Sequence, residues 1–576
     1  MGRSAVHFHP FGGTLRTRFW FQACLDELTG GSPAPCEEAC VQTTLRSLRR
    51  LAPLALAALA TLALAAPLLA QNNNNKSRLP DIGSSAGEVL GPSQQAEYGA
   101  MTLSQLRHYG YILDDPLLED WLQSVGHKLA ANSDKPRQSF TFFLMKDRQI
   151  NAFATLGGYV GTNAGLVLAA TREDQVASVL AHEIAHVTQD HVLRGVERAQ
   201  RDSVPILLAM LGAILVAQQA GGNSSDDASM AALSAGQALM YQRQIDYTRD
   251  NEAEADRVGM STLSRSGYDP KAMAEFFTTL QGWVRANQGG SRERTPDYLQ
   301  THPITVTRIS EAKERAATMK ATNNFAAPTT ANPMLPGNIR LPEASLAAAG
   351  TGQFAWAKER MRVLSANTPA EAVREYEQMR LKAPLDDAQQ YGLALARLQG
   401  NQPSAAISDL DEVLKKHPND TWIQLAMGEA EARAGKKAES DARFQRLVDR
   451  MPRNRAVVLT YAQVLGERGD AASGKKAQAI LRGLASTSSD DPVYQETFAR
   501  ASDLAGDPIR AGEAHAEAEY LNGRPERALV QLENLKKRSD LDYYARARID
   551  ARIAQITPTV LELHRQGVKD DKVDRN

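Results

Sequence analysis

The stretch His182-Glu183-Ile184-Ala185-His186 lies within a longer segment whose apolar residues recur at helical spacing. Four residues advance an α-helix by about 400°, so the two imidazoles lie on one face, one turn apart. Two nitrogen ligands at that separation suit a zinc ion. Glu183 projects beside them, where it can take a proton from a water molecule at the metal. The stretch therefore predicts a zinc-dependent endopeptidase.

A catalytic zinc needs a third protein ligand and an open position. His191 stands five residues after His186, so on a continuing helix it is rotated to a different face, and we expect it to be structural or exposed. Glu252 and Asp256 are four residues apart and share a face, while Glu254 points elsewhere. Glu252 can bind the metal while Asp256 accepts the N–H of a ligating histidine. Spacing alone does not decide between Glu252 and Glu254.

The segments before the motif indicate a small sheet. Residues 140–144 are rich in aromatic side chains and predict a strand. Residues 152–160 predict a second extended stretch, which the pair Gly157-Gly158 interrupts. Residues 173–192 then predict the helix that carries the motif. The expected fold is α+β and mainly α, with a zinc metallopeptidase domain over residues 79–320.

Two further helical segments follow the motif. Residues 204–217 are almost wholly apolar but, at 14 residues, too short to cross a bilayer. We interpret them as a buried helix or one lying over the active site; the alternative is a helix that touches a membrane or a client protein. Residues 240–266 predict the helix that carries the acidic residues, and Gly267 is well placed to cap its end.

The carboxy-terminal part shows a repeat. Pro384, Pro418 and Pro452 recur every 34 residues. Small residues stand ten positions after each proline, and glycines keep the same spacing in the turns: Ala394, Gly428 and Ala462, then Gly435 and Gly469. This period is typical of tetratricopeptide repeats, whose helical pairs must stack to bury their apolar faces. The alternative is a set of unrelated amphipathic helices.

These patterns set the expected domain boundaries in this half of the chain. Residues 321–350 are rich in Ala, Pro, Thr and Asn and predict a linker. The repeat domain is expected over residues 351–560, as an α-helical solenoid, with a polar tail at 561–576. Residues 491–556 are less regular, which indicates decayed or capping repeats.

The amino-terminal part predicts export. Residues 45–50 are basic, the run 51–70 is rich in Ala and Leu, and a small residue, Ala70, precedes Gln71. This pattern predicts a signal peptide over residues 45–70 and a periplasmic protein, with residues 1–44 as a leader or a mis-assigned start. The alternative is an uncleaved membrane anchor at 51–70.

Composition limits the partners. All three cysteines, Cys24, Cys36 and Cys40, precede the expected cleavage point, so the mature chain would need no disulfide in an oxidising compartment. Charged residues make up 23% of the chain and the net charge is -1, which gives no electrostatic reason to expect nucleic acid as a partner.

An ordered set of motifs carries a family resemblance. They are Leu79-Pro80-Asp81-Ile82-Gly83, Ile150-Asn151-Ala152-Phe153-Ala154 with Gly157-Gly158, the HEIAH sequence, Glu252 with Asp256, and Thr301-His302-Pro303 with Arg308. The chain resembles the CAAX-prenyl-protease type of gluzincin metallopeptidase, and within it the periplasmic proteases that enhance β-barrel assembly. The resemblance covers residues 79–315 and, more weakly, the repeats.

The resemblance implies one Zn2+ per chain, bound by His182, His186 and Glu252. It implies that Glu183 is the general base and that Asp256 supports a ligating histidine. It also implies that the stretch beginning at Asn151, Ala152, Phe153 and Ala154 is an edge strand beside which a substrate backbone lies.

His302 and Arg308 follow the helical metal region. One interpretation is a loop histidine and an arginine in a salt bridge. The other places both in the catalytic group, with His302 approaching either the zinc or the oxyanion of the transition state. A His302 in the fourth coordination position would displace the reactive water and keep the enzyme latent.

Three functions from different classes follow. The first is a periplasmic zinc endopeptidase that removes misassembled outer-membrane proteins, with the repeats docking clients or the assembly machinery and with peripheral membrane association possible in principle. The second is a chaperone or scaffold for outer-membrane protein assembly in which proteolysis is secondary. The third is a zinc-stabilised structural protein, which the lack of cysteine in the mature chain disfavours.

Overall fold

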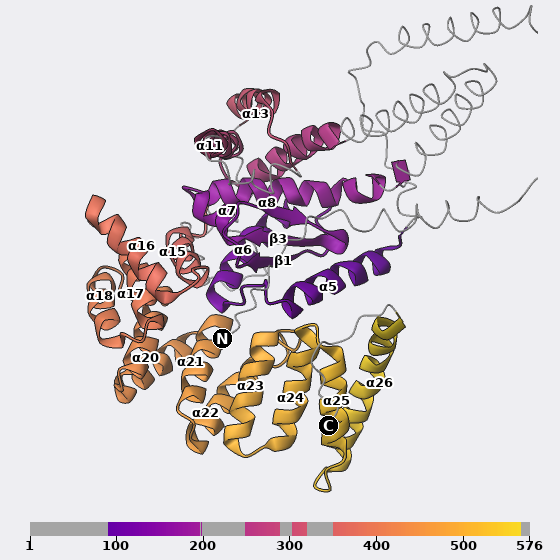
Figure 1. The fold of residues 1–576 in the computed structure, drawn as a ribbon, viewed down its shortest axis with the longest axis vertical. Helices are drawn as coiled ribbons and strands as arrows, with labels where there is room; N and C mark the ends of the chain where they lie inside the picture. The colour runs from indigo at the N-terminus through magenta and orange to yellow at the C-terminus, as the bar shows by residue number, and fades with distance from the viewer. Residues whose placement is uncertain (1–89, 196, 199–247, 288–301, 320–349, 566–576) are drawn as a thin grey trace, which may run out of the picture. The chain divides into compact units, whose positions relative to one another are not determined.

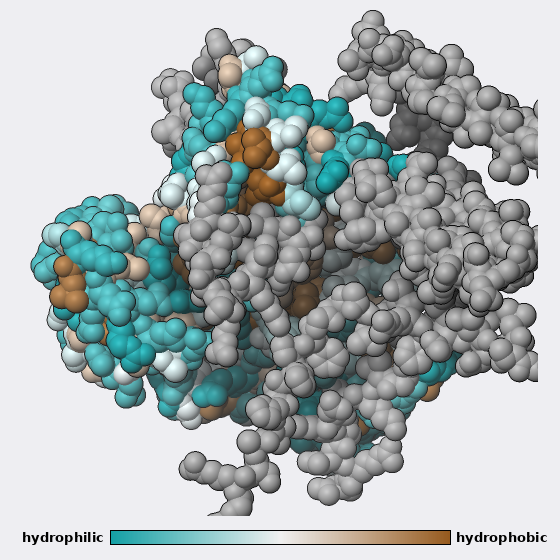
Figure 2. All heavy atoms as spheres, turned by 45° about the horizontal axis from the view of Figure 1, so that its top comes forward, coloured by the Kyte–Doolittle hydropathy of each residue, from teal (hydrophilic) through white to brown (hydrophobic). Residues whose placement is uncertain are grey.

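The computed structural model describes residues 90–195, 197–198, 248–287, 302–319 and 350–565, which belong to one compact unit, Gly83–Asn576. The expected leader, signal peptide or anchor, the apolar segment 204–217, the linker and residues 566–576 of the tail lie outside these ranges. Among the helices within them, none combines the length and the apolar character that crossing a membrane requires. On the face that Figure 2 shows, the described surface is mostly hydrophilic, with a few apolar patches.

The sheet has three strands in the order β1-β3-β2. Strand β1 (Thr141–Met145) pairs in parallel with β3 (Tyr159–Asn163), and β2 (Ala152–Ala154) pairs antiparallel with β3, so β2 is an edge strand. The single extended stretch expected over residues 152–160 is therefore two strands. A 3-10 turn, Leu156–Gly158, separates them. Gly157 and Gly158 have φ angles of 74° and 82° there, which explains the glycine pair.

Helix α8 (Glu173–Thr188) carries the HEIAH sequence and packs against β2 and β3 and against α6 (Pro116–Ala131), as Figure 1 shows. Its apolar residues are buried at the spacing that the sequence shows. The helix ends at Thr188, four residues before the expected end, because the chain turns at Asp190, whose φ is 55°.

Glu173 anchors the beginning of α8. Its carboxylate accepts hydrogen bonds from Nε1 of Trp121 in α6 at 3.0 Å, from the hydroxyl of Tyr268 at 3.1 Å and from the backbone N–H of Thr351 at 2.7 Å. One buried carboxylate thus joins α8 to α6, to Tyr268 and to the start of the repeats.

The helix over residues 248–265 packs next to α8, so that Glu252 and Asp256 lie close to His182. Gly259 makes this approach possible, because a Cβ atom there would lie 3.0 Å from the backbone of Ala181 and His182. Gly267, with a φ of 80°, ends the helix as expected. The N–H of Tyr268 donates a hydrogen bond to the carbonyl of Leu263. Helices α5 (Pro92–His108), α7 (Ala164–Ala169), α11 (Lys271–Asn287) and α13 (Val306–Thr318) complete the described domain.

The carboxy-terminal part is a stack of helical pairs, which confirms the expected repeats. The helices are α15 (Phe354–Leu364), α16 (Pro369–Lys382), α17 (Asp387–Gln399), α18 (Pro403–Lys416), α19 (Thr421–Arg433), α20 (Lys437–Arg450), α21 (Arg455–Glu467), α22 (Ala471–Leu481), α23 (Pro492–Ala505), α24 (Pro508–Leu521), α25 (Pro525–Lys536) and α26 (Tyr543–Arg565). Gly435 and Gly469 adopt φ angles of 80° and 74° in the turns, and Asn401, one period earlier, adopts 56°. The less regular segment 491–556 continues the same pairing.

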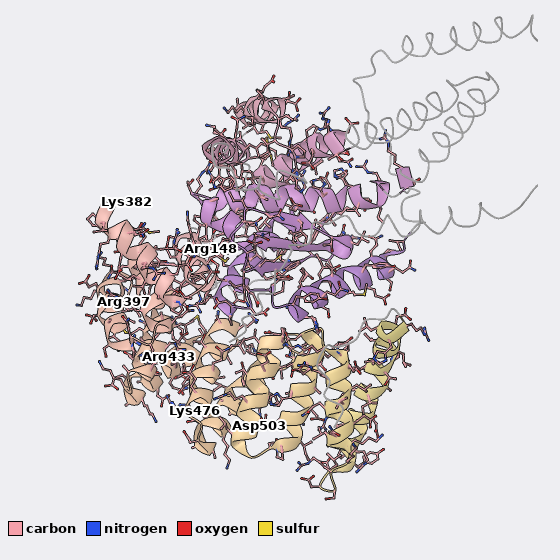
Figure 3. The ribbon with its side chains drawn as sticks, in the orientation of Figure 1. Arg148, Lys382, Arg397, Arg433, Lys476 and Asp503 are labelled. Atoms are coloured by element: carbon pink, nitrogen blue, oxygen red, sulfur yellow. The ribbon has the colours of Figure 1, made fainter. Side chains whose placement is uncertain are left out.

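The repeats contact the part of the chain that holds the sheet through partly buried ion pairs. Arg148, in the loop between β1 and β2, donates to the hydroxyl of Ser365 at 3.0 Å and pairs with Glu375 at 2.5 Å; Figure 3 places it where the sheet meets the first repeats. Arg360 in α15 donates twice to Asp115, at 2.8 and 2.6 Å. Because Arg148 lies three residues before Asn151, the first repeats also hold the loop that leads into the edge strand.

A third contact, at Arg455 in α21, has more negative than positive charge. The Arg455 guanidinium lies 2.7 Å from Glu119, 2.6 Å from Asp491 and 3.9 Å from Asp120. Burial raises the pKa of Glu119 to about 8, and the single guanidinium is shared among too many carboxylates to reverse this. The charged groups that affect this carboxyl group are Arg455, Asp114, Asp491 and Arg107.

We expect this junction to weaken as pH rises. The folded protein holds the Glu119 proton up to about pH 8, whereas the unfolded chain releases it near its ordinary pKa of 4.5, so the free energy of unfolding falls as pH rises between these values. In Glu119→Gln, which carries no such proton, the melting temperature should fall less between about pH 5.5 and about pH 8 than in the wild type. Glu97→Gln, at an exposed position in α5, is the control. An identical pH dependence of melting in Glu119→Gln and wild type would contradict this account.

Candidate metal centre

His182 and His186 present their Nε2 atoms to each other from consecutive turns of α8, 3.0 Å apart. Two neutral imidazoles hold such a position only if a proton or a cation lies between the two lone pairs. Nδ1 of His182 lies 3.0 Å from Oδ1 of Asp256, which leaves Nε2 of His182 free to act as a ligand atom. The pair therefore has the arrangement that a metal ion requires.

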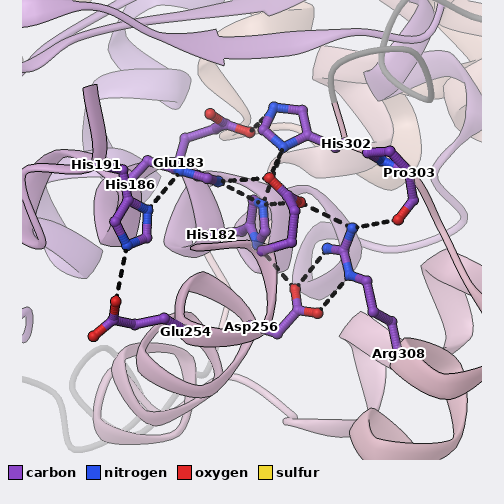
Figure 4. Close-up of polar contacts among 10 residues, drawn as sticks. His182, Glu183, His186, His191, Glu254, Asp256, His302, Pro303 and Arg308 are labelled. Atoms are coloured by element: carbon purple, nitrogen blue, oxygen red, sulfur yellow. Dashed lines mark hydrogen bonds and ion pairs between the residues drawn. The ribbon is translucent and has the colours of Figure 1, made fainter. Parts of the chain in front are cut away.

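Glu252 and His302 complete a cluster of four donor groups with the two histidines, all within 4.8 Å of one another. The Glu252 carboxylate oxygens lie 3.3 Å from Nε2 of His182 and 3.3 Å from Nε2 of His186. Nδ1 of His302 lies 2.9 Å from Glu252 and 3.4 Å from Nε2 of His182. Two ligand atoms of a tetrahedral zinc ion lie about 3.3 Å apart, so these separations suit donors that surround one ion. Figure 4 shows the cluster.

The charges around the cluster also fit a divalent cation. The buried groups include three carboxylates, Glu183, Glu252 and Asp256, and one guanidinium, Arg308. Arg308 donates to both oxygens of Asp256, at 2.7 and 2.8 Å, and its Nη1 lies 2.9 Å from Glu252. With ionised carboxylates and neutral imidazoles, these groups sum to two negative charges, which one divalent cation neutralises.

The pKa values of the two histidines shift in opposite directions. Burial alone lowers the pKa of His182, but the carboxylates of Glu252 and Asp256 raise it to about 10. Burial lowers the pKa of His186 to about 4. Burial disfavours the ionised form of Glu252, yet its contacts with His182, His186 and His302 hold its pKa well below the usual range. The cluster therefore favours one centre of positive charge between its donor atoms.

Glu183 lies beside the cluster, and one of its carboxylate oxygens has no hydrogen-bond partner among the described residues. Its side chain is buried, with 1% exposed. Among the described residues none forms a hydrogen bond with its Oε1 atom, and Nε2 of His302 lies 3.7 Å away. A buried carboxylate oxygen without a partner is costly unless a ligand or a water molecule meets it. The position suits a group that takes a proton from a water molecule at the cluster.

The edge strand β2 lies against α8. The N–H of Asn163 donates to the carbonyl of Asn151, and the N–H of Thr155 donates to the carbonyl of Tyr159. Because pairing alternates along an antiparallel strand, Ala152 and Ala154 direct their backbone groups toward the free edge. Phe153 lies between them, with its ring against Phe143. Among the described residues no further strand pairs with this side of β2, so the residues named from sequence lie along a sheet edge next to the HEIAH helix.

The structure brings together seven of the residues singled out from the sequence and adds one to them. The seven are His182, Glu183, His186, Glu252, Asp256, His302 and Arg308. His191 is not exposed: only 4% of it is accessible, and its Nδ1 lies 2.8 Å from Nδ1 of His186. Glu254 points away from the cluster, as expected, and lies 3.2 Å from Nε2 of His191.

Comparison with known proteins gives matches in both halves of the chain. The model of peptidase family M48 matches residues 116–316, and a model of the tetratricopeptide repeat matches residues 387–420. The chain is 32% identical over 479 residues to the beta-barrel assembly-enhancing protease of Yersinia pestis, which covers 83% of this chain and 91% of that protein. It is 31% identical over 478 residues to the protein of the same name from Escherichia coli strain K12, with the same coverage of 83% and 91%. A relative from Vibrio cholerae is 42% identical over 254 residues, which are 44% of this chain and 50% of that protein.

Proposed function

The chain belongs to peptidase family M48 and is a metalloendopeptidase with a divalent metal, and from this membership we propose that it is a periplasmic zinc enzyme that cleaves misfolded or stalled outer-membrane proteins. One observation carries the proposal. Four donor groups, three of them buried, converge beside a strand edge, with a buried Glu183 oxygen left without a partner among the described residues. A purely structural metal site has no use for such a carboxylate beside its ligands.

We assign the metal to His182, His186 and Glu252. Bound zinc would polarise the carbonyl of the scissile peptide and acidify a water molecule beside it. Nitrogen and carboxylate oxygen donors without sulfur suit a catalytic zinc, which in many enzymes has two histidines and one glutamate. Asp256, held by Arg308, fixes the orientation of His182.

Glu183 performs the proton transfers. Its free Oε1 atom accepts a proton from the attacking water and later passes it to the leaving amine. The carboxylate is buried and projects from the same helix as the two histidines, so little reorganisation is needed during the reaction.

His302 occupies the fourth corner of the donor cluster. Its Nδ1 lies 2.9 Å from Glu252, while its Nε2 faces Glu183 at 3.7 Å. In this position it competes with the reactive water for the metal, which supports a latent resting state. Withdrawal of the histidine would free its Nε2 side to donate to a developing oxyanion. X-ray absorption of the resting zinc enzyme counts its imidazole ligands, and a count of two instead of three would contradict latency.

The substrate is an extended polypeptide that adds to the free edge of β2. Backbone recognition of this kind is broad in sequence, which suits unfolded clients. The names of the Yersinia pestis and Escherichia coli relatives refer to β-barrel assembly, which supports outer-membrane β-barrel proteins as the clients. The stacked repeats, held against the loop before β2 by Arg148, provide a surface for docking clients or assembly machinery.

Export to the periplasm rests on the signal-like residues 45–70. Sequencing the amino terminus of the mature protein tests it: a start near Gln71 supports export and cleavage, and an intact residue 51–70 segment supports the anchor instead.

The experiment for this function measures cleavage of an unfolded outer-membrane β-barrel protein by the zinc-loaded enzyme. In Ala154→Pro, one outward N–H is removed while the bonds between β2 and β3 remain. We expect kcat/KM to fall about tenfold, the value of one main-chain hydrogen bond at the upper end of its range. Ala154→Val keeps the N–H and should stay close to wild type.

Equal rates for Ala154→Pro and Ala154→Val would contradict substrate binding at β2. A wild-type enzyme that cleaves an unfolded water-soluble protein but leaves the unfolded β-barrel protein intact would contradict the client class. Wild-type protein that binds the unfolded barrel and prevents its aggregation without cleaving it would favour the chaperone alternative.

A further inference from the structure

His191 touches the far side of a metal ligand. Its Nδ1 lies 2.8 Å from Nδ1 of His186, and its Nε2 lies 3.2 Å from Oε2 of Glu254. We propose that His191, supported by Glu254, is a positioning residue that fixes the tautomer and ring orientation of His186 for metal binding. The proposal rests on the metal site assigned above and adds a relay that the spacing of the sequence does not reveal.

The backbone brings His191 back to α8 through a left-handed residue. After Thr188 the chain turns at Asp190, which has a φ of 55° and pairs with Nζ of Lys135 at 2.6 Å. A new helical turn begins at His191. On an uninterrupted helix a residue five positions after His186 would be rotated by about 140° from it. The turn at Asp190 cancels this rotation and buries the imidazole.

The proton positions follow from the hydrogen-bond partners. Nε2 of His186 faces the donor cluster and must offer a lone pair, so its hydrogen is on Nδ1. Nδ1 of His191 must then accept that hydrogen, which places the hydrogen of His191 on Nε2. Nε2 donates it to the carboxylate of Glu254. With the hydrogens on Nδ1 of His186 and Nε2 of His191, each of these two contacts pairs one donor with one acceptor.

Arg194 completes the relay. Its Nη2 donates to the same Oε2 atom of Glu254 at 2.7 Å. His191 and Arg194 thus both face this oxygen, and a carboxylate paired with a guanidinium accepts hydrogen bonds. Glu254 therefore holds His191 in the tautomer that His186 needs.

The two ligating histidines thus use different acceptors. On its Nδ1 side His182 faces the carboxylate of Asp256 directly, at 3.0 Å, whereas Nδ1 of His186 faces the imidazole of His191, which in turn contacts Glu254 (Figure 4). Residues that orient a ligating histidine in this way are commonly worth 10 to 100-fold in metal affinity. If His191 mattered only for packing, any side chain that fills its space would serve. Substitutions can therefore separate its role as a hydrogen-bond acceptor from its role in packing.

The test compares two replacements of His191 in the full chain. Asn places an amide oxygen where Nδ1 stands and can accept the hydrogen of His186. Leu fills the space without an acceptor. Zinc affinity is measured by competition with a chromophoric chelator, and the tautomer of His186 by 15N NMR of the histidine-labelled metal-free protein, assigned with His186→Ala.

We expect His191→Leu to bind zinc about 10 to 100-fold more weakly than wild type, and the His186 ring to lose its single tautomer. His191→Asn should stay within about threefold of wild type and keep the Nδ1-protonated tautomer. Glu254→Ala should shift affinity in the same direction as Leu, and the exposed Glu311→Ala in α13 is its control.

The proposal is overturned if His191→Leu binds zinc as tightly as wild type, or if His191→Asn and His191→Leu lose zinc affinity by the same factor. If His191→Leu does not fold, by its circular dichroism, the decision passes to Glu254→Ala, and affinity equal to that of Glu311→Ala overturns the proposal. Wild-type protein that binds no zinc would remove the assigned metal site instead, which distinguishes the two failures.

Discussion

Glu183→Gln is expected to lower kcat for polypeptide cleavage by about 10² to 10⁴-fold, the usual contribution of a general base. Glutamine has the same size and also fits beside His302, but its amide cannot take the proton from water. Glu183 is not one of the four converging donor groups, so bound zinc should remain at one per chain. Cleavage of an unfolded β-barrel protein and metal content are measured on the same preparation.

The matched control is Glu311→Gln, at an exposed position of α13, which should cleave like wild type. Cleavage retained in Glu183→Gln would contradict the assignment of the base. Lost cleavage together with undiminished support of β-barrel assembly in cells would show that proteolysis is secondary and would favour the scaffold function.

Glu252→Gln is expected to remove the metal as well as the activity. The Glu252 carboxylate lies 3.3 Å from each ligating Nε2 atom, 2.9 Å from His302 and 2.9 Å from Arg308. An amide supplies no negative charge, and its NH2 group would face Arg308 or the imidazoles. We expect the loss of zinc affinity to exceed the 10 to 100-fold loss typical of an outer-shell change.

Thermal unfolding measures this loss without reference to activity. A ligand that binds only the folded state raises the melting temperature. Zinc should therefore stabilise the wild type and Glu311→Gln but not Glu252→Gln, and a chelator should reverse the effect. If zinc stabilised Glu252→Gln as much as wild type, another carboxylate would have to be the third ligand, and Glu254 would be the first to test.

The HEIAH helix could be predicted because its information is local. Helical period, a four-residue spacing and two residue types suffice to place His182, Glu183 and His186 on one face. The 34-residue period of Pro384 and its equivalents likewise indicates stacked helical pairs, and the structure confirms them. Asn401 in place of a turn glycine was not foreseen, although asparagine tolerates the same left-handed conformation.

The missed features depend on contacts that are distant in sequence or on one backbone angle. The contact between His191 and His186 does not follow from helical spacing, because the helix ends at Thr188 and the chain turns at Asp190. The approach of residues 248–265 to α8 depends on Gly259, whose close contact with His182 spans 77 residues of chain. The buried pair of Arg360 and Asp115 joins residues 245 positions apart, so the packing of the repeats on the peptidase domain had no local pattern to reveal it.

The choice of Glu252 over Glu254 as a metal ligand could not be made from residue spacing alone. Both residues lie on the same helix, and their spacing to Asp256 favours Glu252 only if that face turns toward His182. The structure places Glu252 in the donor cluster and Glu254 against His191. Each glutamate thus meets a different histidine of the same centre.

The most direct test of the central claim is anomalous diffraction at the zinc absorption edge from crystals of the zinc-loaded full chain. The account predicts one strong peak, about 2.0 to 2.2 Å from Nε2 of His182, Nε2 of His186 and an oxygen of Glu252. A zinc peak outside this cluster, or one bound by the two histidines without Glu252, would contradict it.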